Sequence, residues 1–275
     1  MADELNIPQI SQSLAGTIFG APGAVRHSLR VASTNSAAME AAAAGAPEGS
    51  VFLAEEQTAG RGRGGHGWHS EAGAGLYLSC VLRPKFAPSD ALWLSLIAGL
   101  AAYDAIFEVT GLAADLRWPN DVMLGERKVG GILTELSADS RQVRHAVIGI
   151  GLNVNHTSFP EPLQQTATSL RLQTHRQWPR GELAAALLKS LHREYSALKQ
   201  AGGAAGAGIL LRFEQHSSYV RGAHVEVDDH GGNGFSGVTA GLDARGFLLV
   251  ATAAGMRTVL SGGVRKVRGA LPLGN

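Results

Sequence analysis

The chain has 275 residues, of which 45% are hydrophobic and 17% are charged, so it can bury the core of one large domain or of a large and a small one, and disorder is excluded. The formal net charge is +1, from 24 basic and 23 acidic residues. This excludes a basic surface over the whole protein of the kind that binds nucleic acid, but a local basic patch is still possible. The single cysteine, Cys80, excludes an intrachain disulfide and favours a reducing compartment.

The N-terminal sequence lacks the basic and apolar regions of a signal peptide. The most apolar stretch, residues 91–103, is too short to span a bilayer. We therefore expect a cytoplasmic protein that makes no membrane contact.

Strand and helix patterns alternate through the first part of the chain. Residues 25–32 predict a strand, and the STNS stretch at 33–36 has the residue types that cap the start of a helix, here an alanine-rich one. Two further predicted strands, 51–57 and 75–82, flank the glycine-rich stretch QTAGRGRGGHGW at 57–68.

A buried helix and a hairpin follow. Residues 89–111 are apolar on almost every face of a helix, which we expect to begin at a capping Ser89 or Asp90. Pro119 interrupts the next strand, and LGER at 124–127 predicts the turn of a hairpin.

The strand predicted at 144–155 contains Gly149 and Gly151, and glycine inside a strand usually marks a close approach to the backbone. An amphipathic helix is predicted after Pro179. The low-complexity sequence AGGAAGAG at 201–208 predicts a loop or a frayed helix start.

From about Ser218 onward, five short strand patterns are separated by turn sequences, and no helix pattern occurs. This pattern of short strands and turns predicts a small separate β-barrel. The predicted organisation is an N-terminal arm at 1–24, a large domain at 25–217 and the barrel at 218–275.

Four polar clusters lie at predicted strand ends or loops, where active sites are commonly assembled on a rigid sheet. They are STN at 33–35, the glycine-rich stretch at 57–68, WPND with RKVGG at 118–131, and GIGLNVN at 149–155.

The glycine-rich stretch has side chains suited to anions and bases. Arg61 and Arg63 can form forked hydrogen bonds to phosphate or carboxylate, and Trp68 offers an aromatic face. The stretch lacks the ending of a P-loop and the helix that follows a dinucleotide-binding turn. Taken alone, it is equally consistent with a solvated loop, and an RNA-binding RGG tract is disfavoured because the motif occurs once, between two strands.

The other clusters are ambiguous when each is taken alone. Lys128 is either a solvated edge residue or a fixed charge beside a substrate anion, and Asn120 and Asp121 are typical of turns. The histidines show no HxxxH or HxH spacing, and no GxSxG is present, so neither a zinc site nor a nucleophile elbow is predicted.

In chain order, STN, QTAGRGRGGHGW, LYLS, RWPNDVML, RKVGGILTEL and GIGLNVN closely resemble the motifs of the biotin protein ligases, over roughly residues 25–170. The resemblance implies an α+β fold: a mixed β-sheet with packed helices, like the core of class II synthetases, and a small C-terminal SH3-like barrel. It implies that ATP and biotin form biotinyl-5′-AMP and pyrophosphate, with Mg²⁺ as cofactor. Biotin would then pass to one lysine of a biotin carboxyl carrier domain.

The resemblance also assigns roles to residues. The biotin-binding candidates are Ser33, Thr34, Asn35, Gln57, Arg61, Gly62, Arg63 and Lys128. The adenylate-binding candidates are Arg63, Trp68, Asn120 and Asn153. The catalytic candidates are Arg63, Lys128 and Asp121, of which Asp121 would orient the incoming lysine or help to hold the metal.

The chain departs from the family pattern in three places. His66 and Gly67 stand where the family commonly has a basic pair, and LSGGVRKVRG at 260–269 stands where a GEV turn is frequent. About two dozen residues precede the first strand, too few for the DNA-binding domain of bifunctional members, so a monofunctional ligase without operator binding is expected, as a monomer or a homodimer. The alternatives are a lipoate-type ligase, a biotin-binding protein without catalysis and a non-enzymatic RNA-binding module.

Overall fold

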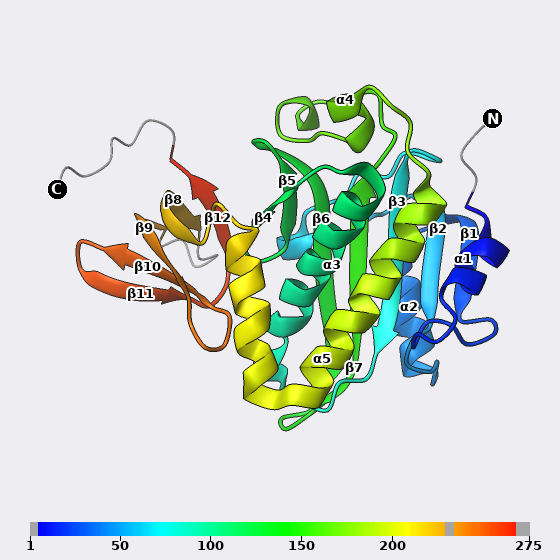
Figure 1. The fold of residues 1–275 in the computed structure, drawn as a ribbon, viewed down its shortest axis with the longest axis horizontal. Helices are drawn as coiled ribbons and strands as arrows, with labels where there is room; N and C mark the ends of the chain where they lie inside the picture. Colours follow the sequence, from blue (N-terminus) through cyan, green and yellow to red (C-terminus); the bar gives the residue numbers. More distant parts are fainter. Residues whose placement is uncertain (1–4, 229–233, 268–275) are drawn as a thin grey trace.

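The computed structural model describes residues 5–228 and 234–267, and its centre is a seven-stranded sheet (Figure 1). The strands are β1 Val25–Val31, β2 Val51–Gln57, β3 Gly75–Leu82, β4 Asp115–Arg117, β5 Asp121–Leu124, β6 Arg127–Ala138 and β7 Val143–Asn153. Their order is β1-β2-β3-β7-β6-β5-β4, with β1 and β2 parallel and every other neighbouring pair antiparallel. The mixed sheet is confirmed, and the helix between β1 and β2 provides the crossover that a parallel pair needs.

The helices are α1 Ile7–Ser13, α2 Thr34–Ala43, α3 Leu92–Thr110, α4 Leu170–Thr174 and α5 Arg180–Gln215. The three predicted helices, α2, α3 and α5, are confirmed, and two short helices, α1 and α4, were not predicted. Ser33 caps α2 by accepting a hydrogen bond from the backbone N–H of Ser36, as expected of this residue type. The predicted cap of α3 is wrong: Ser89 and Asp90 lie in a short 3₁₀ turn, and α3 follows Ala91 without a side-chain cap.

Alternate residues of β7 face opposite sides of the sheet. Ile148, Ile150 and Leu152 are buried in the main core, which α3 and α5 cover. Gly149 and Gly151 face the other side, where α2 packs near one end of the strand. The second face is therefore lined by small residues and has room for polar side chains.

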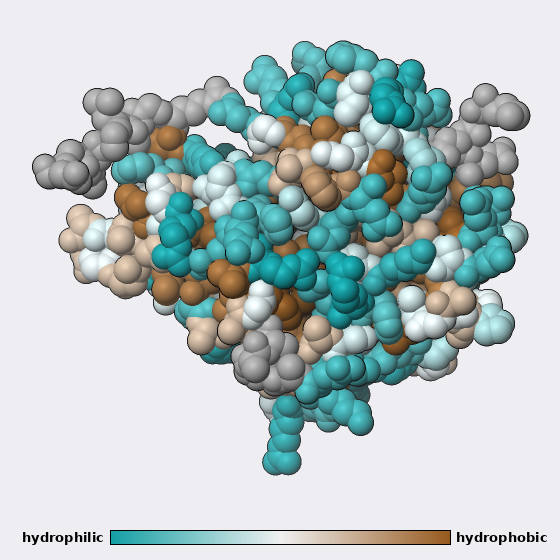
Figure 2. Space-filling model, in the orientation of Figure 1, coloured by the Kyte–Doolittle hydropathy of each residue, from teal (hydrophilic) through white to brown (hydrophobic). Residues whose placement is uncertain are grey.

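Helix α3 packs against α5 and the sheet, in front of the sheet in Figure 1. By length and composition the segment Pro88–Thr110 could cross a membrane, but 56% of its apolar window is buried in the fold, the pattern of a core helix. Seen in space-filling form, the same side of the molecule is largely hydrophilic, with apolar residues in scattered patches (Figure 2).

The predicted loop at 201–208 is wrong, because helix α5 continues through this stretch. A Cβ on Gly206 would lie 3.2 Å from Cη2 of Trp93 on α3, so the missing side chain permits close packing of the two helices. In Figure 1, α5 bends, and its second half (yellow) lies beside the C-terminal sheet.

The C-terminal part forms a separate antiparallel sheet. Its strands are β8 Arg221–Asp228, β9 Phe235–Leu242, β10 Leu248–Thr252, β11 Gly255–Val259 and β12 Gly263–Lys266. The order β11-β10-β9-β8-β12 leaves β11 and β12 unpaired with each other in the described residues. The five predicted strands are confirmed, whereas the closed barrel is corrected to an open SH3-like sheet. Trp118 Nε1 joins the two sheets by donating to the carbonyl of Gly246 at 2.9 Å.

Candidate functional site

A polar network occupies the small-residue face of the sheet where α2 begins. The backbone N–H and the hydroxyl of Thr34 both donate to Oε1 of Gln57, at 2.9 and 3.1 Å. The hydroxyl of Ser79 lies 2.8 Å from Oγ1 of Thr34 and 2.6 Å from Oδ1 of Asn35. Since Thr34, Asn35 and Ser79 are all buried, these contacts fix each side chain in one orientation.

The network continues through Glu135 on β6. Asn35 Nδ2 donates to Oε2 of Glu135 at 2.9 Å, and Arg61 donates to Oε1 of the same carboxylate at 2.7 Å. One carboxylate therefore connects the start of α2 with the glycine-rich stretch.

The glycines of β6 and β7 form a floor for two of these side chains. A Cβ on Gly149 would lie 1.9 Å from Oδ1 of Asn35. A Cβ on Gly151 would lie 2.5 Å from Cε2 of Trp68, and one on Gly131 would lie 2.9 Å from Cζ3 of the same ring. The predicted close approaches at Gly149 and Gly151 are confirmed, with Asn35 and Trp68 as the approaching groups.

A small cavity of about 40 Å³, which we call the inner cavity, lies between this floor and the glycine-rich stretch. Ten of the twelve predicted site residues line it: Ser33, Thr34, Asn35, Gln57, Arg61, Gly62, Arg63, Trp68, Asn120 and Lys128. A larger outer cavity adjoins it and is shared with the C-terminal sheet. Asp121 lines only the outer cavity.

Arg63 connects three parts of the molecule. Its guanidinium donates to Oδ1 of Asn120 at 3.3 Å and to the carbonyl of Gly262 at 3.1 Å. Burial lowers the pKa of Arg63, and the nearby charge of Asp121 partly offsets this shift. Because Gly262 lies between β11 and β12, the C-terminal sheet contacts the glycine-rich stretch directly.

Lys128 belongs to a charged triad at the hairpin of β5 and β6. Its ammonium pairs with Asp121, which also pairs with Arg117. Burial of Asp121 opposes its ionisation, but Lys128 and Arg117 outweigh this effect and hold the pKa of the carboxyl below its ordinary value. The ammonium also lies 5.4 Å from the centre of the Trp68 ring, within range of a cation–π contact.

The structure places Asn153 away from both cavities. Its buried side chain donates to the carbonyl of Thr168 at 3.0 Å and to that of Lys128 at 3.5 Å. These contacts hold the end of β7 against the neighbouring segments.

Two residues of the network, Ser79 and Glu135, were not predicted. Ser79 is the hydroxyl residue inside the otherwise apolar strand GLYLSCVL, and Glu135 is the acid inside ILTEL. A polar residue in a buried strand needs a partner, and this signal could have identified both.

Comparison with known proteins identifies the family. Residues 29–153 match the biotin/lipoate A/B protein ligase family. The biotin–acetyl-CoA-carboxylase ligase of Mycobacterium tuberculosis is 35% identical over 266 residues, which cover 94% of this chain and 95% of that protein. The chain belongs to the biotin protein ligases.

Two further biotin protein ligases support this assignment. The bifunctional ligase/repressor BirA of Bacillus subtilis is 36% identical over 234 residues, 84% of this chain and 70% of that protein. The solved structure of the Aquifex aeolicus biotin protein ligase in complex with biotin and ATP is similar with a TM-score of 0.77 at 31% identity, covering 88% of this chain and 99% of that one. The biotin protein ligase fold therefore extends over most of the present chain.

Proposed function

We propose that this protein is an ATP-dependent biotin–protein ligase that acts on a biotin carboxyl carrier domain. Biotin and ATP would form biotinyl-5′-AMP and pyrophosphate, and biotin would then pass to one lysine of the carrier. The observation that carries the proposal is the inner cavity, which gathers ten of the twelve predicted site residues from segments far apart in the chain.

The polar network at the start of α2 suits the ureido group of biotin. That group needs acceptors for two N–H bonds and donors for one carbonyl oxygen. Ser33, Thr34, Asn35 and Gln57 provide hydroxyls, amides and a backbone N–H at one end of the cavity. We assign these four residues to the head of biotin.

The cationic end of the cavity suits the reacting groups. A carboxylate oxygen of biotin attacks the α-phosphorus of ATP, the new C(=O)–O–P bond forms, and the bond to pyrophosphate breaks. Both reactants are anionic, so the guanidinium of Arg63 and the ammonium of Lys128 would offset their repulsion and stabilise the charge on the α-phosphate. We assign Arg61 and Gly62 to covering biotin, and Trp68 and Asn120 to the adenylate.

In the second step the ε-amine of the carrier lysine attacks the carbonyl carbon, the C–N bond forms, the C–O bond to the phosphate breaks, and AMP leaves as the nitrogen loses a proton. We assign Asp121 to positioning Lys128, because its carboxylate already pairs with Lys128 and with Arg117. The same engagement makes Asp121 a poor metal ligand, and no carboxylate is among the described residues that line the inner cavity. The inner cavity therefore does not fit a protein-held Mg²⁺, and we expect Mg²⁺ to enter bound to the phosphates of ATP.

A direct test incubates the protein with Mg-ATP and either biotin or lipoate, and measures pyrophosphate release. Mass spectrometry of a biotin carboxyl carrier domain then detects the added biotinyl group on lysine. We expect release with biotin and one modified lysine. Release with lipoate alone would indicate a lipoate-type ligase, and salt-sensitive RNA binding without release would indicate the RNA-binding alternative.

We further propose a cytoplasmic location, the compartment in which the carrier substrate would be met. We do not expect operator DNA to be a ligand. A gel-shift experiment with biotin-regulated operator DNA would contradict this expectation if the protein bound it specifically.

A further inference from the structure

A cluster of ligating side chains lies outside the two cavities of the proposed ligase site. His69 and Glu71 precede β3, and His156 follows β7. Because the first residue of β3, Gly75, pairs with the last residue of β7, Asn153, the segments outside these strand ends meet at the same edge of the sheet.

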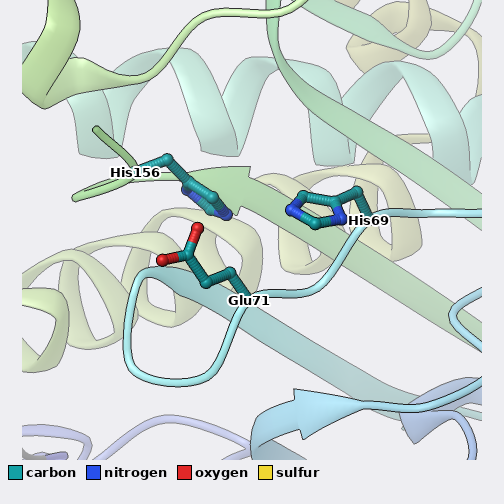
Figure 3. Close-up of side chains that lie close together, drawn as sticks. All are labelled: His69, Glu71 and His156. Carbon is teal, nitrogen blue, oxygen red and sulfur yellow. The ribbon is translucent and has the colours of Figure 1, made fainter. Parts of the chain in front are cut away.

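The three side chains bring potential ligand atoms together. One imidazole nitrogen of each histidine and one carboxylate oxygen of Glu71 lie within 4.8 Å of one another. Figure 3 shows the two rings and the carboxylate turned toward a common centre. Phe159 stacks on the ring of His156, with centroids 5.0 Å apart, and closes one side of the cluster.

One further group, the hydroxyl of Tyr77, lies beside the cluster. The hydroxyl of Tyr77 donates its one proton to the carbonyl of Glu71, at 3.0 Å. The same hydroxyl lies 3.2 Å from Nε2 of His156.

Nδ1 of His156 is buried and has no hydrogen-bond partner within the described ranges 5–228 and 234–267. A buried polar atom without a partner is unfavourable, so His156 is the member of the cluster whose hydrogen bonding is incomplete.

We propose that His69, Glu71 and His156 bind a divalent transition-metal ion of the zinc class. Two imidazoles and one carboxylate are a common protein ligand set for Zn²⁺, with a water molecule in the fourth position. Mg²⁺ prefers oxygen ligands, so this site would be distinct from the metal that accompanies ATP. Tetrahedral zinc places its ligand atoms about 3.4 Å apart. Glu71 is exposed and His69 is half-buried, so both can rotate to close the remaining distance.

A metal ion bound here would connect the segment before β3 with the segment after β7. His69 directly follows Trp68, whose ring lies on the floor of the inner cavity. A bound ion would therefore fix the C-terminal end of the glycine-rich stretch and the exit of β7, and it would stabilise the fold by mass action.

The test titrates the full-length, chelator-treated protein with ZnCl₂ by calorimetry, without ATP or biotin. We compare the wild type with His69→Ala/Glu71→Gln, in which two ligands are lost and His156 remains. The matched control is His66→Ala/Glu161→Gln, which removes one exposed histidine and one exposed glutamate outside the cluster.

We expect one equivalent of Zn²⁺ to bind the wild type and the control. The cluster variant should bind at least about tenfold more weakly, a loss of the size seen when even an outer partner of a metal ligand is removed. Zn²⁺ should raise the melting temperature of the wild type and the control but not that of the cluster variant. Co²⁺ should give the intense visible bands of a four-coordinate ion.

Equal zinc affinity in all three proteins would overturn the proposal, as would a weak octahedral cobalt spectrum in the wild type. The metal-free melting temperatures show whether the variants fold, and we expect them to agree because neither His69 nor Glu71 is buried. The readouts are binding and stability, so a failure of the proposed ligase activity would leave this test unaffected.

Discussion

At the scale of single residues, Arg63 has acceptors that a phosphate could replace. Nη1 of its guanidinium donates to the amide oxygen of Asn120 and to the carbonyl of Gly262, which are neutral acceptors. Hydrogen bonds to an ionised acceptor are roughly twice as strong as those between neutral groups. The adenylate phosphate would therefore compete successfully for the same guanidinium.

We expect Arg63→Gly to weaken retention of biotinyl-AMP more than its formation. Loss of a charged hydrogen bond costs about 1.5–3 kcal/mol, or roughly a 10- to 100-fold faster release of the intermediate. The measurement is the appearance of biotinyl-AMP in solution, and Arg141→Gly, at an exposed turn, is the control. Unchanged release would contradict the role given to Arg63.

Lys128→Ala tests the ammonium directly. We expect pyrophosphate release to fall by about 100-fold or more, because removal of one preorganised charge-stabilising group typically has an effect of this size. Asp121 keeps Arg117 as a partner, so the fold should persist, and circular dichroism checks this. Lys85→Ala, which removes an exposed lysine, is the control, and a folded Lys128 variant with normal release would refute the assignment.

At the scale of elements, the two faces of β7 lie in different environments because successive side chains point to opposite sides of the sheet. Its large residues face the helices, and its glycines face the polar network. The glycines are therefore required by the neighbouring side chains and not by their own backbone angles.

Gly149→Ala should lower biotin affinity at least about tenfold and destabilise the protein by about 1–3 kcal/mol, the usual cost of overpacking. The added Cβ would lie 1.9 Å from Oδ1 of Asn35 and would displace that side chain from Ser79. Calorimetric titration with biotin and urea unfolding measure the two effects. Gly208→Ala, where no heavy atom lies within 4 Å of the new Cβ, should leave biotin binding unchanged. Equal affinity in both variants would argue against a structural role for Gly149.

The sequence predicted these elements well where the signal was local. The bounds of β2 and β3 agree with the prediction because apolar runs end at polar or glycine-rich turns. The continuation of α5 could not be predicted, because Gly206 is explained by Trp93 on another helix. The open C-terminal sheet was also missed, since strand patterns do not indicate whether the end strands pair.

The site was predictable as a set of residues but not as a set of contacts. The motifs in chain order identified ten residues that share the inner cavity. The contact between Asn35 and Glu135 spans 100 residues, and that between Arg63 and Gly262 spans 199. Local patterns carry no information on pairs so distant, and the meeting of His69 with His156 was missed for the same reason.

At the scale of the whole molecule, the buried His156 couples stability to pH. Its pKa is about 4 in the folded protein, whereas an unfolded histidine titrates near 6.5. Between these values the unfolded chain binds a proton that the folded protein does not. The free energy of unfolding is therefore highest above about pH 6.5 and falls as the pH falls toward 4.

We expect this loss to be on the order of 3 kcal/mol between pH 7 and pH 4. Urea unfolding of the metal-free protein across this range measures it. His156→Gln should flatten the profile, while His66→Gln, at an exposed position, should not. Parallel profiles for the wild type and His156→Gln would show that another group is responsible.

The indole of Trp68 lies on Gly131 and Gly151 in the very space that we assign to ligand, and its Nε1 has no partner in the described part of the chain. We expect biotin to enter only after this ring has moved, so capture should include a unimolecular step. In stopped-flow experiments that follow tryptophan fluorescence, the observed rate should level off as the biotin concentration rises. At high biotin concentration, the rate of biotin binding would then be limited by the movement of the Trp68 ring and not by diffusional encounter.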